Sequence, residues 1–254
     1  MAVAPLMSCD EERTPFVSIL IPAFKEAEHI EATVKSIVQT FRNCGLLYEI
    51  LIVLDVVPGD RTPACVRKIA RTYPEVRVIE RQGKRGVGDA IRTGIRGATG
   101  EVVIPVMGDQ SENPADILRL ARRAQYCDIV FTERFRLGRP AGYPVVKYVA
   151  NRCCNLAVSL LFRIPYTDTT NAFKAYRRDL LSRIELHSKG FEIFLELPLK
   201  VMMLGPAKTD QIEVNHTVRK KKFAKLSVLK DGSRYVRVLI SLLRDGLSAA
   251  SHMQ

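Results

Sequence analysis

The sequence of 254 residues contains no tryptophan, and aromatic residues make up only 7% of it. Proteins that bind single-stranded nucleic acids stack bases on aromatic side chains that alternate with basic ones, so this scarcity argues against nucleic acid as a partner. The sequence also lacks a Cys-x-x-Cys pair, and none of its six cysteines lies at zinc-finger spacing from a histidine. We expect reduced thiols, as is usual in cytosolic proteins.

Long apolar runs are equally scarce. A transmembrane helix needs about 20 apolar residues, and the longest candidates, residues 150–164 and 236–243, are too short or are interrupted by arginine. Residues 1–14 carry acidic side chains where a signal peptide needs a basic and then an apolar segment. We therefore expect a cytoplasmic protein without a membrane span, resting at most on a membrane surface.

Two enzyme motifs are missing as well. The sequence has no G-x-x-x-x-G-K-S/T phosphate loop and no G-x-S-x-G nucleophile elbow. The four histidines, His29, His187, His216 and His252, form no cluster along the chain. The sequence therefore favours neither a P-loop nucleotide hydrolase, nor a serine hydrolase, nor a histidine-ligated metal centre.

Positive charge is abundant. The chain has 39 Lys and Arg against 27 Asp and Glu, a net charge of +12, and 47% of its residues are hydrophobic. The hydrophobic content is enough for a folded core, and the charge predicts attraction to phosphorylated small molecules or to the acidic face of a membrane. The sequence leaves open whether the protein forms an oligomer.

Apolar, β-branched runs alternate with segments whose apolar residues recur at helical spacing. This alternation predicts an α/β protein with a mostly parallel sheet and helices on both faces, followed by amphipathic helices near the C-terminus. The predicted strands are 16–22, 49–54, 76–79, 101–106 and 128–132, and the predicted helices are 27–41, 63–73, 87–96, 114–124, 145–162, 191–204 and 227–248.

Polar side chains follow three of these strands, at residues 22–26, 55–60 and 108–109. Ligands of parallel sheets bind beyond the carboxyl ends of the strands, so we expect the chemistry to converge there. By itself Asp55 is either a ligand for a nucleotide or the cap of a turn. Asp109 is likewise either a metal ligand or the start of the helix at 114.

Two charged features lie later in the chain. Glu192 and Glu196 are four residues apart and share a helix face, which suits an acid/base pair or an edge that is solvated or paired with arginine. The basic run at 219–222 is either a solvated surface or a phosphate-binding segment.

Seven segments follow one another along the chain: VSILIPAFKEAEHI, EILIVLDVVPGDRT, GKRGVGDAIRTGIRGATGEVVIPVMGDQSENP, DIVFTERF, DTTNAFKAYRR, GFEIFLELPLK and RKKKFAKL. They are similar to family 2 inverting glycosyltransferases of the dolichyl-phosphate mannose synthase type, and the likeness covers residues 16–245. The resemblance implies a GT-A (Rossmann-like) fold, a GDP- or UDP-sugar donor, a divalent metal (Mg or Mn) and a polyprenyl phosphate acceptor.

The resemblance also assigns roles to matching positions. Asp109 matches the second Asp of the D-x-D motif, so it is expected to bind the metal together with Ser111 and to contact the donor. Arg134 and Arg219 are expected to act with Asp109 in catalysis. The expected donor-binding residues are Pro22, Ala23, Glu26, Asp55, Gly88, Asp89 and Asp109, with Asp60 and Thr62 as a D-x-T pair, and the expected phosphate-binding residues are Arg134, Arg152, Arg219 and Lys225.

The sequence departs from the family pattern at several of these motifs. Met107 stands where the first Asp of D-x-D is expected, Val56 where a second strand-two Asp is expected, and Lys25 where the loop Asn is expected. Lys222 and Ala224 replace a Gly and a Ser of the basic motif. One carboxylate can still hold magnesium, because that ion is typically bound by one or two carboxylates plus substrate phosphates.

We expect a flexible N-terminus at 1–15, a GT-A domain at 16–226 and an amphipathic helical segment at 227–254. Within the GT-A domain, the nucleotide-sugar half is expected at about 16–132 and the acceptor half at about 133–226. The segment 145–162 carries Lys147 and Arg152 on an apolar background, which suits a membrane interface or a core helix.

Two alternatives stay open. The same fold could glycosylate a hydroxyl acceptor, which would need a general base from Asp109, Asp168 or Glu192. A phosphate acceptor is already ionised near neutral pH and needs no such base. The second alternative is a non-catalytic basic binding module, with Met107 as a trace of lost metal chemistry.

Overall fold

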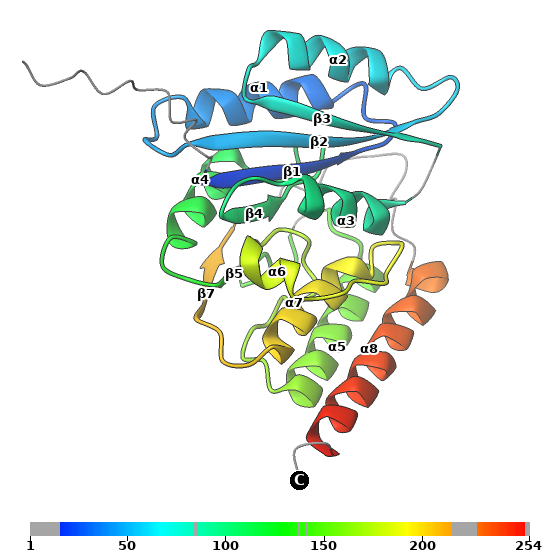
Figure 1. The fold of residues 1–254 in the computed structure, drawn as a ribbon. Coiled ribbons are helices and arrows are strands. Elements are labelled where there is room, and N and C mark those ends of the chain that lie inside the picture. The colour runs from blue at the N-terminus through cyan, green and yellow to red at the C-terminus, as the bar shows by residue number, and fades with distance from the viewer. Residues whose placement is uncertain (1–15, 84–85, 137, 141, 215–227, 252–254) are drawn as a thin grey trace, which may run out of the picture.

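Seven strands form one sheet in the computed structural model, which describes residues 16–83, 86–136, 138–140, 142–214 and 228–251 (Figure 1). The order is β3-β2-β1-β4-β6-β5-β7, and among these strands β6 alone runs antiparallel to its neighbours. The strands are β1 (Val17–Ala23), β2 (Tyr48–Val56), β3 (Val76–Gln82), β4 (Val102–Pro105), β5 (Ile129–Glu133), β6 (Ala175–Arg177) and β7 (Thr209–Glu213).

Helices cover both faces of this sheet. Because side chains alternate along a strand, Ile19 and Ile21 of β1 pack with one set of helices, while Leu20 packs with the other. Figure 1 shows α1 and α2 above the sheet and α3 below it. The first set is α1 (Ile30–Phe41), α2 (Thr62–Thr72) and α4 (Pro114–Arg123), and the second is α3 (Val87–Gly97), α6 (Arg178–Ser182) and α7 (Ile193–Met203).

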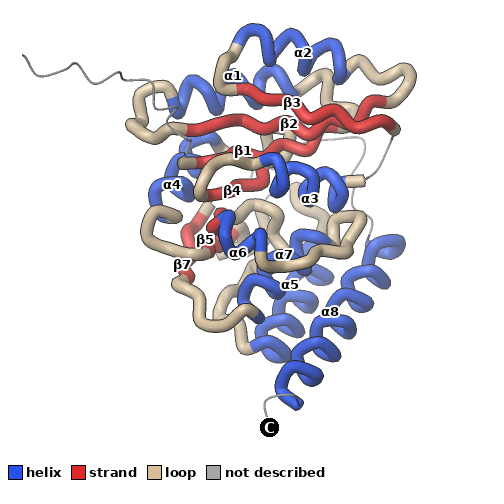
Figure 2. Tube along the Cα trace, viewed as in Figure 1, coloured by secondary structure: helices blue, strands red, loops and turns tan. Residues whose placement is uncertain are grey.

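Two long helices, α5 (Val145–Phe162) and α8 (Val228–Ser251), lie side by side beyond α7 (Figure 2). They share a small core with α7, formed by Val158, Leu195 and Leu242 among others. Only two α5 residues, Asn155 and Val158, are buried. In the described part of the chain, α5 is the one helix long and apolar enough to cross a membrane, by length and composition alone.

The predicted mostly parallel sheet with helices on both faces is confirmed. Three elements, β6, α6 and β7, were not predicted. The strand β6 has only three residues, and β7 (TDQIE) has no apolar run that would mark it. The predicted boundary at 132 falls inside β5, while those at 15 and 226 fall at residues outside the described ranges, so the domain division stays a prediction.

Candidate active site

The carboxyl ends of β1 and β2 open into one large cleft of about 1870 Å³. Pro22 and Ala23 at the end of β1 and Asp55 near the end of β2 line it, so three predicted donor-binding residues are brought together. The segment 187–192, which precedes α7, and residues of α8 form another part of the wall. This volume exceeds the roughly 300–1,000 Å³ of ordinary ligand pockets.

The loop after β1 is braced by the predicted D-x-T pair. The amide of Lys25 donates to Asp60 Oδ2 (3.0 Å), and the amide of Glu26 donates to Thr62 Oγ1 (2.9 Å). Thr62 Oγ1 in turn donates to Asp60 Oδ1 (2.6 Å). Lys25 adopts a left-handed conformation (φ 54°), which a lysine adopts less readily than the expected asparagine. Glu26 is buried and does not line the cleft.

Asp55 forms a buried ion pair with Arg81, a residue that the sequence analysis did not single out. Arg81 Nε donates to Asp55 Oδ1 (2.8 Å), and the two residues are register partners on β2 and β3. Arg81 also donates to the carbonyl of Gly86 at the start of the next helix (3.3 Å). The pair therefore fixes the Asp55 carboxylate at the cleft wall.

Gly88 lies in the first turn of α3 and packs against the segment before α7. Its amide donates to the carbonyl of Lys189 (2.9 Å), and a Cβ at Gly88 would collide with the carbonyl oxygen of Ser188. Asp89 pairs with Arg92 on the same helix. Neither Gly88 nor Asp89 lines the cleft, so their predicted nucleotide contacts stay predictions.

Glu196 holds the cleft wall in place. Its carboxylate accepts from the amides of His187 (2.9 Å) and Ser188 (2.8 Å) and pairs with Lys200 (3.1 Å). Burial opposes ionisation, but these hydrogen bonds outweigh it and lower the pKa of Glu196. Glu192 is also buried and lines the cleft. The prediction that these two residues form a solvated edge is therefore wrong, because helix α7 faces the interior.

Asp109 is not a helix cap. The N-cap of α4 is Asn113, whose side chain accepts from the amide of Ala115. Asp109 Oδ1 instead accepts from the amide of Ser111 (3.2 Å). This arrangement removes helix capping as the explanation of Asp109 and leaves its carboxylate in a short polar loop.

Glu112, which sequence reasoning missed, joins this loop. Its Oε2 accepts from the hydroxyl of Ser111 (3.0 Å) and from the amide of Met107 (3.2 Å). Burial and the nearby charge of Asp109 raise the pKa of Glu112 to about 7. In the described ranges no group of three or more His, Cys, Asp or Glu side chains converges. Two carboxylates and one hydroxyl nevertheless share this loop.

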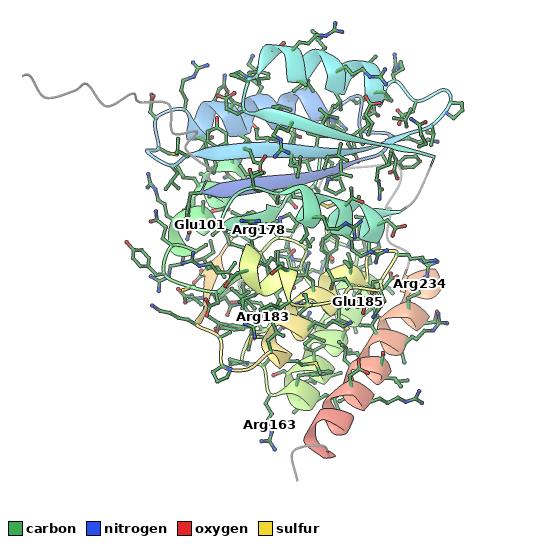
Figure 3. All side chains as sticks on the ribbon, in the orientation of Figure 1. Glu101, Arg163, Arg178, Arg183, Glu185 and Arg234 are labelled. Atoms are coloured by element: carbon green, nitrogen blue, oxygen red, sulfur yellow. The ribbon has the colours of Figure 1, made fainter. Side chains whose placement is uncertain are left out.

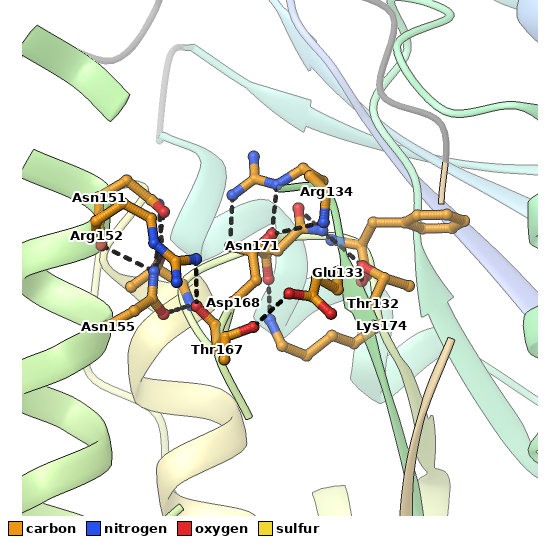
Figure 4. Close-up of polar contacts among 12 residues, drawn as sticks. Thr132, Glu133, Arg134, Asn151, Arg152, Asn155, Thr167, Asp168, Asn171 and Lys174 are labelled. Carbon is orange, nitrogen blue, oxygen red and sulfur yellow. Dashed lines mark hydrogen bonds and ion pairs between the residues drawn. The ribbon is translucent and has the colours of Figure 1, made fainter. Parts of the chain in front are cut away.

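Arg134 is held in a buried cluster (Figure 4). Its Nε and Nη2 donate to the two carboxylate oxygens of Asp168 (2.8 Å each), and Lys174 donates to the carbonyl of Asn171. Burial opposes ionisation of Asp168, but the Arg134 guanidinium outweighs it and keeps the pKa of that carboxyl low. Burial lowers the pKa of Lys174 to about 7. Asp168 is thus unsuited to act as a general base.

A smaller pocket of about 180 Å³ joins Arg134 to the Asp109 loop, because it is lined by Arg134, Ser111 and Glu112. Met107 and Phe191 line both this pocket and the large cleft.

The other predicted phosphate-binding residues are placed differently. Arg152 lies on α5 and lines neither pocket, and its Nη1 donates to the carbonyl of Thr167 (3.2 Å). Arg219 and Lys225, with the replaced positions Lys222 and Ala224, lie outside the described residues.

Among solved structures, the fold is similar to glucosyl-3-phosphoglycerate synthase from Mycobacterium tuberculosis. One structure of that enzyme, with Mn²⁺, uridine diphosphate and phosphoglyceric acid, superposes with a TM-score of 0.70 at 18% identity, covering 90% of this chain and 78% of that one. Another, with Mg²⁺ and uridine diphosphate, has a TM-score of 0.67 at 19% identity and covers 90% of this chain and 79% of that one. The predicted GT-A fold is confirmed.

Curated relatives share the sequence pattern. A dolichol-phosphate mannosyltransferase of Pyrococcus furiosus is 28% identical over 72% of this chain and 52% of its own length, so the chain spans about half of that relative. An undecaprenyl-phosphate mannosyltransferase of Micrococcus luteus is 26% identical over 74% of this chain and 79% of its own length. A family model described as glycosyl transferase family 2 matches residues 18–185, which hold the β1 and β2 side of the cleft, the Asp109 loop and the Arg134 cluster, and the chain belongs to that family.

Proposed function

We propose that this protein transfers a sugar from a nucleoside diphosphate donor to a polyprenyl phosphate with the help of a divalent metal. Two observations support it. The cleft and the smaller pocket meet at Met107 and Phe191, so a donor in the cleft and an acceptor in the pocket would occupy adjoining sites. The two mannosyltransferase relatives are named for dolichol phosphate and undecaprenyl phosphate acceptors.

The donor nucleoside is assigned to the ends of β1 and β2. Asp55 is fixed there by Arg81, and the neighbouring backbone of Pro22 and Ala23 lines the same cleft. A fixed carboxylate suits the hydrogen-bond donors of a base or a ribose, and it would repel a diphosphate. The diphosphate therefore extends away from Asp55, toward the Asp109 loop.

The Asp109 loop has the donor atoms that a magnesium or manganese site needs. Asp109 and Glu112 contribute carboxylates and Ser111 a hydroxyl, and such hard oxygen ligands suit these ions. Glu112 bonds to the amide of Met107, so a carboxylate lies beside the position where the D-x-D pattern lacks one. A bound metal would offset the negative charge that develops on the departing diphosphate.

Arg134 is assigned to the acceptor phosphate. Asp168 occupies its Nε and Nη2, and Figure 4 shows the third guanidinium nitrogen directed away from Asp168. The pocket that Arg134 lines also adjoins the Asp109 loop. A phosphate monoester is ionised near neutral pH, so it can attack the sugar without a general base. This agrees with the burial of Asp168, which is unavailable for that task.

The exposed face of α5 supports a lipid-linked acceptor. Asn151 of α5 donates to the hydroxyl of Thr170 (2.7 Å), and Thr170 lines the smaller pocket, so α5 is attached directly to the proposed acceptor site. A polyprenyl chain stays in the bilayer, and an apolar helix face with basic residues suits its interface. The large exposed apolar residues of α5 are Val145, Val146, Val149, Leu156, Leu160 and Leu161.

The test is a transfer assay. The protein is incubated with GDP- or UDP-hexoses labelled in the sugar, with Mg²⁺ or Mn²⁺ and a short polyprenyl phosphate. We expect metal-dependent release of the nucleoside diphosphate and passage of label into an organic phase. Label that remains in water on a hydroxyl acceptor would replace the lipid acceptor with a soluble one. The absence of nucleotide release from every donor would overturn the transferase assignment.

A further inference from the structure

One carboxylate oxygen of Glu192 is not satisfied by the protein. Glu192 is 5% exposed, and its Oε1 accepts from the amide of Gly190 (2.9 Å). Its Oε2 is buried and has no hydrogen-bond partner within the described chain. Leaving a buried polar group without a partner costs about 1–3 kcal/mol, and more for a charged one. A ligand that donates to Oε2 would remove this cost.

The backbone around Glu192 is held, so the carboxylate is presented from a fixed wall. On one side, the amide of Ser188 is bonded to Glu196. On the other, the hydroxyl of Tyr235 donates to the carbonyl of Phe191 (3.1 Å). A group placed this firmly is suited to recognition, because a ligand does not have to order it first.

The surroundings of Oε2 favour a hydroxyl over a phosphate. A Cβ at Gly190 would lie 2.6 Å from Glu192 Oε2 and 3.0 Å from Arg234 Nη1, so the carboxylate and the guanidinium lie on the same side of Gly190. Both residues line the cleft, and Figure 3 shows Arg234 at the end of α8 that lies nearest the sheet. A hydroxyl can donate to the carboxylate and accept from the guanidinium, whereas a phosphate would be repelled by Glu192.

The position of Glu192 identifies the part of the donor that meets it. Its neighbour Phe191 lines both the cleft and the smaller pocket, together with Met107. The nucleoside is assigned to the Asp55 end of the cleft and the acceptor phosphate to Arg134. The transferred sugar has to lie between them, at the junction beside Glu192.

We propose that Glu192 Oε2 accepts a hydrogen bond from a hydroxyl of the transferred sugar, and that Glu192 thereby selects which sugar is accepted. This inference rests on the proposed function, because it needs a nucleoside diphosphate sugar in the cleft. It assigns Glu192 to substrate recognition and not to proton transfer.

Binding measurements test it without turnover. Calorimetry would compare GDP, UDP, their hexose derivatives and the deoxy analogues of the hexose that binds best. In the wild type we expect one deoxy analogue to bind more weakly than its parent. Glu192→Gln, which replaces Oε2 by an amide donor of the same size, should weaken binding of the parent sugar roughly ten- to hundredfold. It should leave the affinity for the free nucleoside diphosphate unchanged. The variant should also bind the parent nucleotide sugar and its deoxy analogue equally well.

Glu196→Gln is the matched control, because Glu196 serves the cleft wall through hydrogen bonds to the protein. It should lower the melting temperature and weaken diphosphate and diphosphate sugar alike. The inference is overturned if Glu192→Gln also weakens both alike, or weakens neither. If the wild type binds no nucleotide hexose, the proposed function itself fails and the inference with it, and that outcome is read from the wild type alone.

Discussion

The two sides of the site secure their charged groups in different ways. Beside the large cleft, Asp55 is held by Arg81, its register partner on the next strand of a parallel sheet. Beside the smaller pocket, Arg134 follows β5, and its partner Asp168 lies in the connection between α5 and β6. The first pair is set by strand register, and the second depends on packing between segments more than thirty residues apart.

This difference predicts that the Asp55–Arg81 pair and the Arg134 cluster respond differently to substitution. A pair between neighbouring strands forms whenever the sheet forms, so the side of the large cleft inherits the stability of β1, β2 and β3. The cluster beside the smaller pocket holds Asp168, Arg134 and Lys174 together, and each depends on the others because an isolated buried charge is costly. Substitutions there should affect stability and function at once.

The largest effect is expected from Asp168→Asn. It leaves the Arg134 guanidinium without its carboxylate and should lower the free energy of unfolding by about 3–5 kcal/mol. Urea unfolding would measure it. Glu101→Gln is the control, because Glu101 pairs with Arg177 at the surface and such pairs contribute about 0–1 kcal/mol. Equal, small losses from both variants would show that the Arg134 cluster is no more interdependent than a surface pair.

Asp109→Asn, in the loop that adjoins the smaller pocket, should come next. We expect metal-dependent turnover to fall about a hundredfold, because the remaining ligands hold a divalent ion and its diphosphate less well. Metal affinity, measured with the nucleoside diphosphate present, should fall in parallel. Asp116→Asn serves as the control, since Asp116 is buried in α4 and pairs with Arg119. Unchanged metal affinity in Asp109→Asn would remove Asp109 from the metal site.

A third prediction concerns the pH dependence of stability. Burial holds the pKa of Lys174 at about 7, below its ordinary value of 10.5, so between these values the unfolded chain binds one proton more than the folded chain. Stability should therefore rise with pH in this window, by at most about 1.4 kcal/mol per pH unit. Lys174→Met should lack this rise when unfolding is measured from pH 7 to 9. If the stability of Lys174→Met and of the wild type rises equally with pH, the low pKa assigned to Lys174 is contradicted.

The smallest effect is expected at the surface. Leu160 of α5 is 72% exposed, and Leu160→Ser should weaken binding to anionic liposomes about tenfold, since a buried leucine contributes about 1.5–3 kcal/mol. Leu47, just before β2, is 47% exposed and provides the matched control Leu47→Ser. Co-sedimentation with liposomes would measure both. Equal binding by the two variants would remove α5 from the membrane interface.

The sequence predicted the side of the large cleft more completely than the side of the smaller pocket, for physical reasons. Strands such as residues 17–23 are apolar runs between turn residues, and their parallel order follows from alternation with helices. The strand β6 is short and runs antiparallel, and the pattern in β7 is polar, so no periodicity marked them. Helix α5 had the predicted limits, yet its large exposed apolar surface is visible only once its neighbours are known.

The site residues differ in the same way: those marked by a sequence pattern could be predicted, and the others could not. Pro22, Ala23 and Asp55 could be placed at one cleft because strand ends meet at one edge of a parallel sheet. Arg81 could have been found by aligning strands 49–54 and 76–79 in register. Glu112 carried no such signal, because its contact with the Met107 amide depends on the turn at Gln110, which has a left-handed backbone (φ 60°).

The close packing of Gly88 has a consequence for how the protein is made. The first turn of α3 reaches its final environment only against the carbonyl groups of Ser188 and Lys189, about a hundred residues later in the chain. During synthesis, strands β1 to β4 are therefore made first, and this wall of the cleft is complete only after the segment that precedes α7 has been added. A chain that ends before residue 188 would lack the carbonyl groups against which Gly88 packs, so this wall of the cleft would be incomplete.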